Sequence, residues 1–318
     1  MTAENSIPYL TEDTLLGLGI STAEVIKSIE QVIFRQAQQN AWTAPKAVML
    51  PDDGRYLMAT LSAADDPNIL AVKSLVVNPE NLSQGLPQIN GLVTLLNSQT
   101  GLPIAILDAN WITAVRTAGL SATAASYLAR RESRIAAFVG CGVQAKSHLQ
   151  AFADLFPVTE VRLFGRGKNN IDIMREQSER RSLKVIECDS ADEAIMSADL
   201  IVSSVSYEHD MKPFLDAQKL KPGAFAAIVD LAVPWIKESF AGLNQLIIDD
   251  LEQEAVLPNK LAVPKDITGD LSGLVLEECR GRDLEEDRNA FVFRGHALGD
   301  LALSILVYEK ARLHGLIE

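Results

Sequence analysis

The spacing of apolar positions changes several times along this chain, and each change predicts a different kind of element. Between residues 12 and 40, apolar side chains such as Val25, Ile29 and Val32 recur at helical spacing. A later alanine-rich run, 112–130, also has the character of a single helix. Both stretches are therefore predicted to be helical.

Strand-like runs begin after Pro45. The pair Asp53-Gly54 is a turn signal of the kind that joins two strands of a hairpin. The runs that flank and follow it are 47–51, 55–61, 69–77, 91–96 and 103–107. Short adjacent strands joined by tight turns indicate an antiparallel sheet, so the first hundred residues are predicted to form an α+β unit.

From Ser133 onward, strand-like and helical segments alternate. The predicted strands are 134–139, 158–164, 183–187, 200–204, 225–229 and 245–248, with helices at 143–155 and 169–182. Such alternation is typical of parallel βαβ units and predicts a doubly wound α/β sheet of the Rossmann type. A last helix is predicted at 297–314. Its pattern alone does not show whether it packs with the α+β unit or with the parallel sheet.

Composition and charge exclude several classes of protein. The 318 residues contain 29 Lys and Arg against 42 Asp and Glu, a net charge of −13. Nucleic acids and anionic membranes attract basic surfaces, so neither is expected as a partner. The chain has three widely spaced cysteines, which argues against a disulfide framework and against a Cys-based metal site. With no leader pattern and no apolar run of about 18 residues, a cytoplasmic location is expected.

A glycine-rich turn follows the apolar strand IAAFV and opens a helix. It has the form G-x-G-x-x-A and comprises Gly140, Gly142, Val143, Gln144 and Ala145 around one cysteine. The first glycine permits a tight turn, the second lets a pyrophosphate approach the backbone, and the small last residue lets the helix pack closely. The motif predicts a dinucleotide site, with a plain tight turn as the alternative.

The loop after the next strand bears on the choice of dinucleotide. An NAD site usually carries an acidic residue there for the ribose 2′-hydroxyl, whereas this chain has Arg166 and Lys168. Two cations suit a 2′-phosphate, so NADP is favoured and NAD is the alternative, unless the two residues only form a solvated basic loop. Ser203 and Ser204, after a later strand, are predicted to lie where the nicotinamide half of the cofactor would pass, with plain polar residues at a strand end as the alternative.

Four charged residues stand out because their neighbours in the sequence are apolar. They are Lys46, Lys73, Arg116 and Asp230. Lys73 lies in a strand apolar enough to suggest burial on both faces. A buried unpaired charge costs several kcal/mol, so these groups are expected to face one another or a cleft. The alternatives are a snorkelling lysine, a helix-capping arginine and a turn-forming aspartate, while His148 is expected on a helix surface.

The chain resembles the ornithine cyclodeaminase/μ-crystallin family in several motifs that occur in the family's order. They are GLPQINGLVTLLNSQTGLPIAILDANWITAVRTAGLSATAASYLAR, the following IAAFVGCGVQAKSHLQAF, and the closing GHALGDLALSILVYEKA. Members of this family include ornithine cyclodeaminases, alanine dehydrogenases and imino-acid reductases. The resemblance implies a substrate-binding and dimerisation domain, 1–115 with 297–318, a Rossmann domain, 116–296, and a homodimer.

The resemblance also implies roles for the four charged residues. Lys46 and Arg116 take the places of groups that hold the substrate carboxylate, Lys73 matches a lysine beside the reacting carbon, and Asp230 matches an aspartate that orients the substrate nitrogen. We therefore expect three cations and one acid to meet the nicotinamide ring in one cavity. No metal site is expected.

The chain departs from the family pattern at two places. Many members have a Gly-Pro-Gly-Lys type loop after the aspartate, where this chain reads Leu-Ala-Val-Pro-Trp, and Trp235 is expected to shape the substrate pocket. Phe293 stands where a serine is common. Both changes argue against strict ornithine cyclodeaminase activity.

The predicted function is therefore an NAD(P)H-dependent reductase or dehydrogenase of a small anionic 2-imino or 2-amino acid. Two alternatives belong to other classes. One is a lyase that recycles a bound cofactor, as ornithine cyclodeaminase does, and the other is a non-enzymatic NADPH-binding protein like μ-crystallin.

Overall fold

The computed structural model describes residues 6–206 and 211–317. The chain divides into two compact units, one formed by 1–116 with 296–318 and the other by 117–295. These ranges lie one residue from the boundaries expected from the sequence. The functional roles expected for the two units stay predictions.

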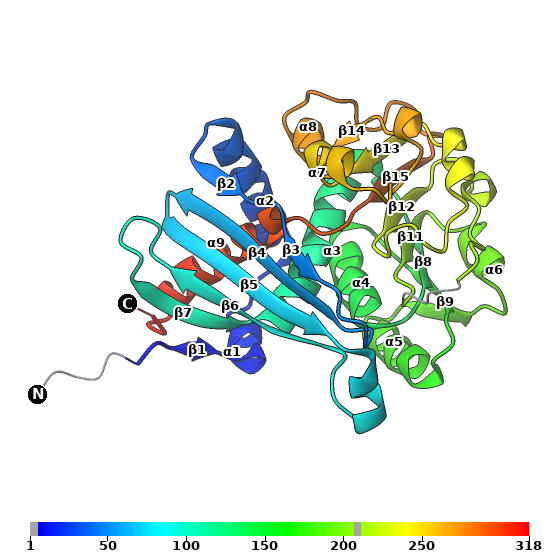
Figure 1. Ribbon diagram of the computed structural model, residues 1–318. Coiled ribbons are helices and arrows are strands. Elements are labelled where there is room, and N and C mark those ends of the chain that lie inside the picture. The colour runs from blue at the N-terminus through cyan, green and yellow to red at the C-terminus, as the bar shows by residue number, and fades with distance from the viewer. Residues whose placement is uncertain (1–5, 207–210, 318) are drawn as a thin grey trace, which may run out of the picture. The chain divides into compact units, whose positions relative to one another are not determined.

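The first unit is built on a mixed sheet (Figure 1). Its strands are β1 (Tyr9–Leu10), β2 (Ala41–Thr43), β3 (Ala47–Met49), β4 (Tyr56–Asp65), β5 (Asn68–Val77), β6 (Ile89–Leu96) and β7 (Pro103–Asp108). Their order is β1-β7-β6-β5-β4-β2, and β3 pairs with β4. Apart from the parallel pair β1 and β7, the pairs are antiparallel. The predicted antiparallel strands and the hairpin around Asp53-Gly54 are confirmed.

Two helices occupy the N-terminal stretch that was predicted as helical throughout. α1 (Glu12–Gly17) and α2 (Thr22–Ala37) are separated by a turn in which Gly19 has a φ of +60°. α2 begins with a capping box, because the Ser21 hydroxyl accepts from the Glu24 N–H while the Glu24 carboxylate accepts from the Ser21 N–H. The cap and the glycine together interrupt the helical pattern.

The C-terminal helix α9 (Ala297–Leu313) lies against α2, β4 and β5 (Figure 1). The buried Ser28 hydroxyl of α2 donates to the Ala302 carbonyl at 2.7 Å. Residues from both ends of the sequence therefore build one compact unit.

Lys73 lies on the covered face of β5. Ile69, Ala71, Lys73 and Leu75 are buried in alternation with partly or fully exposed residues. The prediction that this strand is buried on both faces was wrong, because successive side chains of a strand point to opposite faces and only one face of this sheet is covered within the unit. Lys73 is nevertheless fully buried.

The second unit is built on a parallel sheet. Its strands are β8 (Ile135–Val139), β9 (Glu160–Phe164), β10 (Lys184–Glu187), β11 (Leu200–Ser203), β12 (Phe225–Ile228), β13 (Gln245–Ile248), β14 (Gly269–Asp270) and β15 (Asn289–Val292). Their order is β10-β9-β8-β11-β12-β15-β13-β14. Because β8 lies between β9 and β11, the chain winds both ways from β8, and ligands bind at such a switch point. The predicted doubly wound α/β fold is confirmed.

Helices connect these strands. They are α4 (Val143–Leu155), α5 (Lys168–Arg180), α6 (Ala191–Ile195), α7 (Leu251–Val256) and α8 (Leu271–Val275), together with the second part of α3 (Ala109–Leu128). Short 3₁₀ segments occupy Pro79–Gln84 in the first unit and Ala217–Lys219, Lys237–Gly242 and Pro264–Asp266 in the second. The sequence pattern did not reveal β14, β15, α6, α7 or α8. β14 has two residues, and each of the three helices has six residues or fewer, too short to show helical periodicity.

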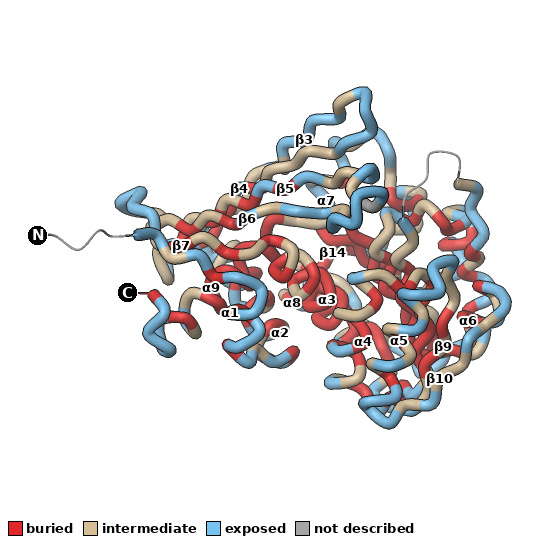
Figure 2. Tube along the Cα trace, turned by 90° about the horizontal axis from the view of Figure 1, so that it is seen from below, coloured by how far each residue is buried: buried red, intermediate tan, exposed pale blue. Residues whose placement is uncertain are grey.

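Small apolar residues fill the core of the second unit. The strands IAAFV and FAAI are buried almost throughout, and alanines let the covering helices approach the sheet closely. Figure 2 shows α3 mainly buried and β3 exposed. Among the described residues, no helix is both long enough and apolar enough to cross a membrane.

His148 is a core residue and not the surface residue that was expected. It is fully buried in α4, with Nδ1 2.7 Å from the Gln144 carbonyl and Nε2 2.9 Å from the Ser121 hydroxyl of α3. Nδ1 must donate to the carbonyl, so Nε2 accepts the hydroxyl proton. Burial lowers the pKa of His148 to about 4, so the imidazole is neutral.

Candidate active site

The glycine turn joins β8 to α4 at the switch point of the parallel sheet. Gly140 has a φ of +89°, and a Cβ built there would lie 2.6 Å from the Ser204 carbonyl oxygen. The Ser204 hydroxyl donates to the Gly140 carbonyl at 3.1 Å. Only glycine fits at position 140, because the end of β11 passes too close for any side chain.

The second glycine has a different role. Gly142 precedes α4 in extended conformation, and a Cβ built on it meets no atom within 4 Å. Ala145 is fully buried, so the start of α4 packs closely on its neighbours. Val143 is exposed, and the Gln144 side-chain oxygen is buried without a hydrogen-bond partner among the described residues. The open space at Gly142 and the free N–H groups of the helix start suit an anion.

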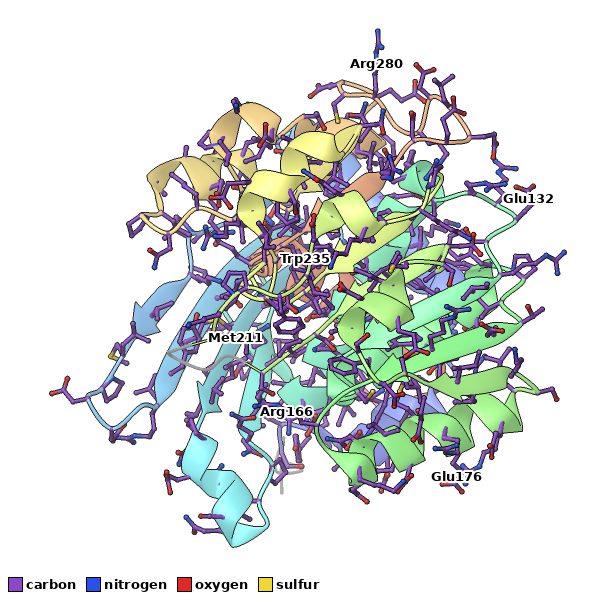
Figure 3. The ribbon with its side chains drawn as sticks, turned by 90° about the vertical axis from the view of Figure 1, so that its right-hand side faces the viewer. Glu132, Arg166, Glu176, Met211, Trp235 and Arg280 are labelled. Carbon is purple, nitrogen blue, oxygen red and sulfur yellow. The ribbon has the colours of Figure 1, made fainter. Side chains whose placement is uncertain are left out.

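A cavity of about 640 Å³ lies at this turn. Its lining comes from the ends of β8, β9, β10 and β11 and includes Gly140, Gly142, Arg166, Asn170, Asp189, Asp192, Ser204 and Met211. Arg166 and Met211 are labelled in Figure 3. This volume and the glycine turn suit part of a dinucleotide.

The two predicted 2′-phosphate ligands lie in different places. Arg166 lines the cavity, whereas the Lys168 ammonium is exposed and forms an i,i+4 ion pair with Asp172 at 2.8 Å. The predicted pair of cations is thus divided between the cavity and the surface of α5. Asp189 and Asp192 also line the cavity, two acids that the sequence pattern did not single out.

The two serines predicted to lie near the cofactor also differ in their surroundings. Ser204 lines the cavity, but Ser203 is fully buried, and its hydroxyl donates to Asp230 Oδ1 at 3.2 Å. Asp230 follows β12, and its Oδ2 accepts from the Val205 N–H at 3.1 Å. Burial raises the pKa of Asp230 to about 7, although these hydrogen bonds oppose the rise. This carboxyl group is therefore able to exchange a proton near neutral pH.

Trp235 does not have the exposure that a pocket-shaping residue needs. It is 1% exposed and packs against Phe240, with ring centroids 5.9 Å apart. Its indole N–H donates to the Ser203 hydroxyl at 2.8 Å. The side chain, labelled in Figure 3, belongs to the buried core of the second unit, so the expectation that it lines the substrate pocket was wrong.

A second cluster of charges is buried in the first unit. Lys73 Nζ and Arg116 Nε lie 2.6 and 3.1 Å from the same oxygen of Asp300, Oδ1. The Thr60 hydroxyl donates to the other oxygen, Oδ2, at 3.0 Å. The three charged residues are 6% exposed or less, and Arg116 Nη1 has no hydrogen-bond partner among the described residues. Two cations thus share one carboxylate.

The electrostatics of this cluster favour a further anion. The pKa of Lys73 is lowered to about 8. Burial lowers it most, the charges of Arg116 and Lys46 also lower it, and the charge and hydrogen bond of Asp300 oppose these effects. Lys46 therefore lies near enough to act on Lys73. Burial acts to raise the pKa of Asp300, but Lys73 and Arg116 hold it below its usual value. A bound carboxylate would balance the excess positive charge.

Sequence reasoning missed Asp300 and Thr60. The signal for Asp300 was present, since a carboxylate inside the apolar helix ALGDLALSILV must be paired. Thr60 gave no signal, because threonine is common in strands. The imidazole Nε2 of His296, which precedes α9, lies 3.3 Å from the Thr43 hydroxyl.

Comparisons with known proteins agree with this architecture. The family model described as ornithine cyclodeaminase/mu-crystallin family matches residues 16–314. A Delta(1)-pyrroline-2-carboxylate reductase of Bacillus cereus is 28% identical over 270 residues, 81% of this chain and 82% of that protein. The ketimine reductase mu-crystallin of Rattus norvegicus is 30% identical over 258 residues, 80% of this chain and 79% of that protein.

Solved structures show the same fold. The Thermococcus litoralis Delta(1)-pyrroline-2-carboxylate reductase in complex with NADH and L-proline has a TM-score of 0.87 and 25% identity, covering 98% of this chain and 99% of that one. An archaeal alanine dehydrogenase dimer with bound NAD has a TM-score of 0.85 and 24% identity, covering 98% of each chain. The match of the family model over nearly the whole chain shows that this protein belongs to the ornithine cyclodeaminase/mu-crystallin family.

Proposed function

We propose that this protein is a nicotinamide-dependent oxidoreductase that acts at the α-carbon of a small 2-imino or 2-amino acid. Its relatives include a pyrroline-2-carboxylate reductase and a ketimine reductase, both named as reductases of C=N compounds, and the first of these compounds carries a carboxylate. Reduction of the imine and oxidation of the amine are the two directions of the same hydride transfer.

The buried charge cluster carries this proposal. Lys73 and Arg116 contribute two positive charges and Asp300 one negative charge, so the cluster retains one positive charge away from water. Arg116 Nη1 still has a hydrogen bond to donate. A planar guanidinium binds a carboxylate through two parallel hydrogen bonds. The cluster therefore suits the α-carboxylate of the substrate, with Lys46 adding to the local positive charge.

The glycine turn suits the pyrophosphate of a nicotinamide cofactor, which when bound supplies or accepts the hydride. NADP is the proposed form, because Arg166 lines the cavity and no acid follows β9 in the usual NAD position. Asp189 and Asp192 line the same cavity, so NAD is the competing form. Hydride transfer requires this cofactor and the substrate held by Arg116 to meet, which stays a prediction.

Two groups have pKa values suited to the proton chemistry. Ionised Asp230 would stabilise the positive charge of a protonated imine nitrogen, the form that accepts hydride most readily. Protonated Lys73 would attract the substrate carboxylate and exchange a proton near neutral pH, since its pKa is about 8. The roles assigned to Asp230 and Lys73 are part of the proposal.

A substrate panel tests the proposed function. We expect oxidation of NADPH, and more slowly of NADH, with pyrroline-2-carboxylate or with pyruvate plus ammonia. Arg116→Met should raise the KM for the imino acid about 100-fold, because two charge-assisted hydrogen bonds are lost. Ammonia release from ornithine without net cofactor turnover would instead indicate a lyase. Tight NADPH binding without turnover of any imine would indicate a binding protein.

A homodimer is the proposed assembly. The uncovered face of the first unit's sheet exposes large apolar side chains, among them Leu61, Val76 and Leu92 on β4, β5 and β6. An exposed apolar face of this kind is typical of a protein interface. Sedimentation equilibrium should give twice the chain mass, and Leu92→Glu should lower it. A monomer at micromolar concentration would contradict this assembly.

A further inference from the structure

We propose that Ser203 and Trp235 form a hydrogen-bonded relay that positions Asp230 and stabilises its carboxylate form. The catalytic importance of this relay rests on the proposed function, because the contact of Asp230 with a substrate nitrogen is part of that proposal. The relay itself is a property of the second unit. It gives roles to a serine that the sequence placed beside the cofactor and to a tryptophan that the sequence placed in the pocket.

The direction of the hydrogen bonds follows from the donors available. The indole N–H of Trp235 is a donor only, so in the 2.8 Å contact the Ser203 oxygen must accept. The Ser203 hydroxyl proton is then left for its second partner, Asp230 Oδ1, at 3.2 Å. Hydrogen bonds in such a chain polarise one another. Trp235 thus fixes the rotamer of Ser203 and strengthens its donation to Asp230.

Trp235 is also well anchored. It packs against Phe240 in the core, and its backbone N–H donates to the Ala232 carbonyl at 3.2 Å. The intervening Leu231 and Ala232 adopt left-handed φ values of +59° and +55°, a conformation that is strained for any residue with a side chain. A strained turn immediately after Asp230 persists only where its surroundings hold it, and the buried indole is one of those constraints.

Because Asp230 is buried, each hydrogen bond to its carboxylate has a large effect on its ionisation. Burial is the largest influence on its carboxyl group and favours the neutral form. The groups that oppose burial are the Ser203 hydroxyl and the backbone N–H groups of Val205, Asp230 and Ala232. Ser203 supplies the side-chain hydrogen bond among these, and a substitution can remove it without altering the backbone.

A direct titration of Asp230 tests the relay. The full-length protein, labelled with [4-¹³C]aspartate, is titrated by ¹³C NMR, and Asp230→Asn identifies the signal. Ser203→Ala should raise the apparent pKa of Asp230 by about one pH unit, since one hydrogen bond to the charged form is lost. Trp235→Phe should raise it by less, because Ser203 remains but is no longer oriented. Phe240→Leu is the control for packing: it loosens the contact with the indole but removes no hydrogen-bonding group of the relay, so it should leave the pKa of Asp230 unchanged.

The outcomes separate the relay from a merely structural role. If Ser203→Ala leaves the Asp230 titration where it was, the relay is overturned. If Trp235→Phe behaves like Phe240→Leu, Trp235 is only a core residue. If Trp235→Phe does not fold, Ser203→Ala and Ser203→Thr test the relay instead. Ser203→Thr keeps the hydroxyl and should titrate like the wild type. The NMR titration needs no turnover, so a protein that reduces no imine would refute the proposed function and leave this test unaffected.

Discussion

Lys73 and Asp300, 227 residues apart in the sequence, form a 2.6 Å ion pair that is fully buried between β5 and α9. Removing one partner of a buried pair leaves the other charge unpaired, which costs more than losing the contact itself. Asp300→Asn should therefore lower the free energy of unfolding by roughly 3 kcal/mol.

Denaturant unfolding measures this effect. Glu309→Gln is the matched control, since Glu309 is an exposed acid on the same helix, and it should change the free energy of unfolding by less than about 0.5 kcal/mol. Equal effects of the two substitutions would mean that the buried pair contributes nothing to stability.

The pH dependence of catalysis should be a narrow bell. Asp230, with a pKa of about 7, must lose its proton, and Lys73, with a pKa of about 8, must keep its proton. kcat/KM should therefore rise through pH 7 and fall above pH 8. Initial rates in constant-ionic-strength buffers, taken to about two pH units beyond each limb, are the measurement. Asp230→Asn should abolish the acidic limb, and Lys73→Arg should move the basic limb upward.

The two glycines of the turn should respond differently to alanine. At Gly140 the left-handed φ and the 2.6 Å approach to Ser204 leave no room for a methyl group, so Gly140→Ala should lower the melting temperature. Gly142→Ala should keep the fold, because its Cβ meets no atom. It should still weaken cofactor binding about tenfold, since the methyl group occupies the space meant for the pyrophosphate. Calorimetry and fluorescence titration distinguish the two, and unchanged NADPH affinity in Gly142→Ala would place the pyrophosphate elsewhere.

Cofactor preference should depend on Arg166 and not on Lys168. Arg166 lines the cavity, whereas Lys168 is exposed and paired with Asp172. Arg166→Ala should raise the KM for NADPH about tenfold and leave that for NADH unchanged, because a charge-assisted hydrogen bond to the 2′-phosphate is lost. Lys168→Ala is the matched control and should have little effect. A preference for NADH in the unmodified protein would argue that Asp189 or Asp192 governs the choice.

His148 should make the protein sensitive to acid. Its folded-state pKa of about 4 lies below the ordinary value of 6.5. Between these two pH values the unfolded chain binds a proton at His148 and the folded chain does not. The stability is fully present above pH 6.5 and is lost as the pH falls toward 4, at about 1.4 kcal/mol per unit. His148→Gln should flatten this part of the pH–stability curve, as followed by urea unfolding. The same slope in both proteins would assign the acid sensitivity to other groups.

Much of the fold followed from the sequence pattern. The hairpin at Asp53-Gly54 joins strands that are adjacent in the sequence, and most strands and the longer helices after Ser133 are marked by their own apolar spacing, so the local pattern was enough to predict them. The pattern failed where local spacing carries little information. β14 has two residues, and the break between α1 and α2 depends on a glycine turn and a cap more than on apolar spacing.

The candidate site was predictable in its residue types but not in their pairings. An apolar context marked Lys73, Arg116 and Asp230 as charges that need a partner, and the glycine motif marked the turn at 140–145. The sequence by itself therefore determined which groups are costly to bury. Which group meets which was decided by the tertiary structure, because Asp300 reaches Lys73, and Trp235 reaches Ser203, only after segments distant in the sequence pack together.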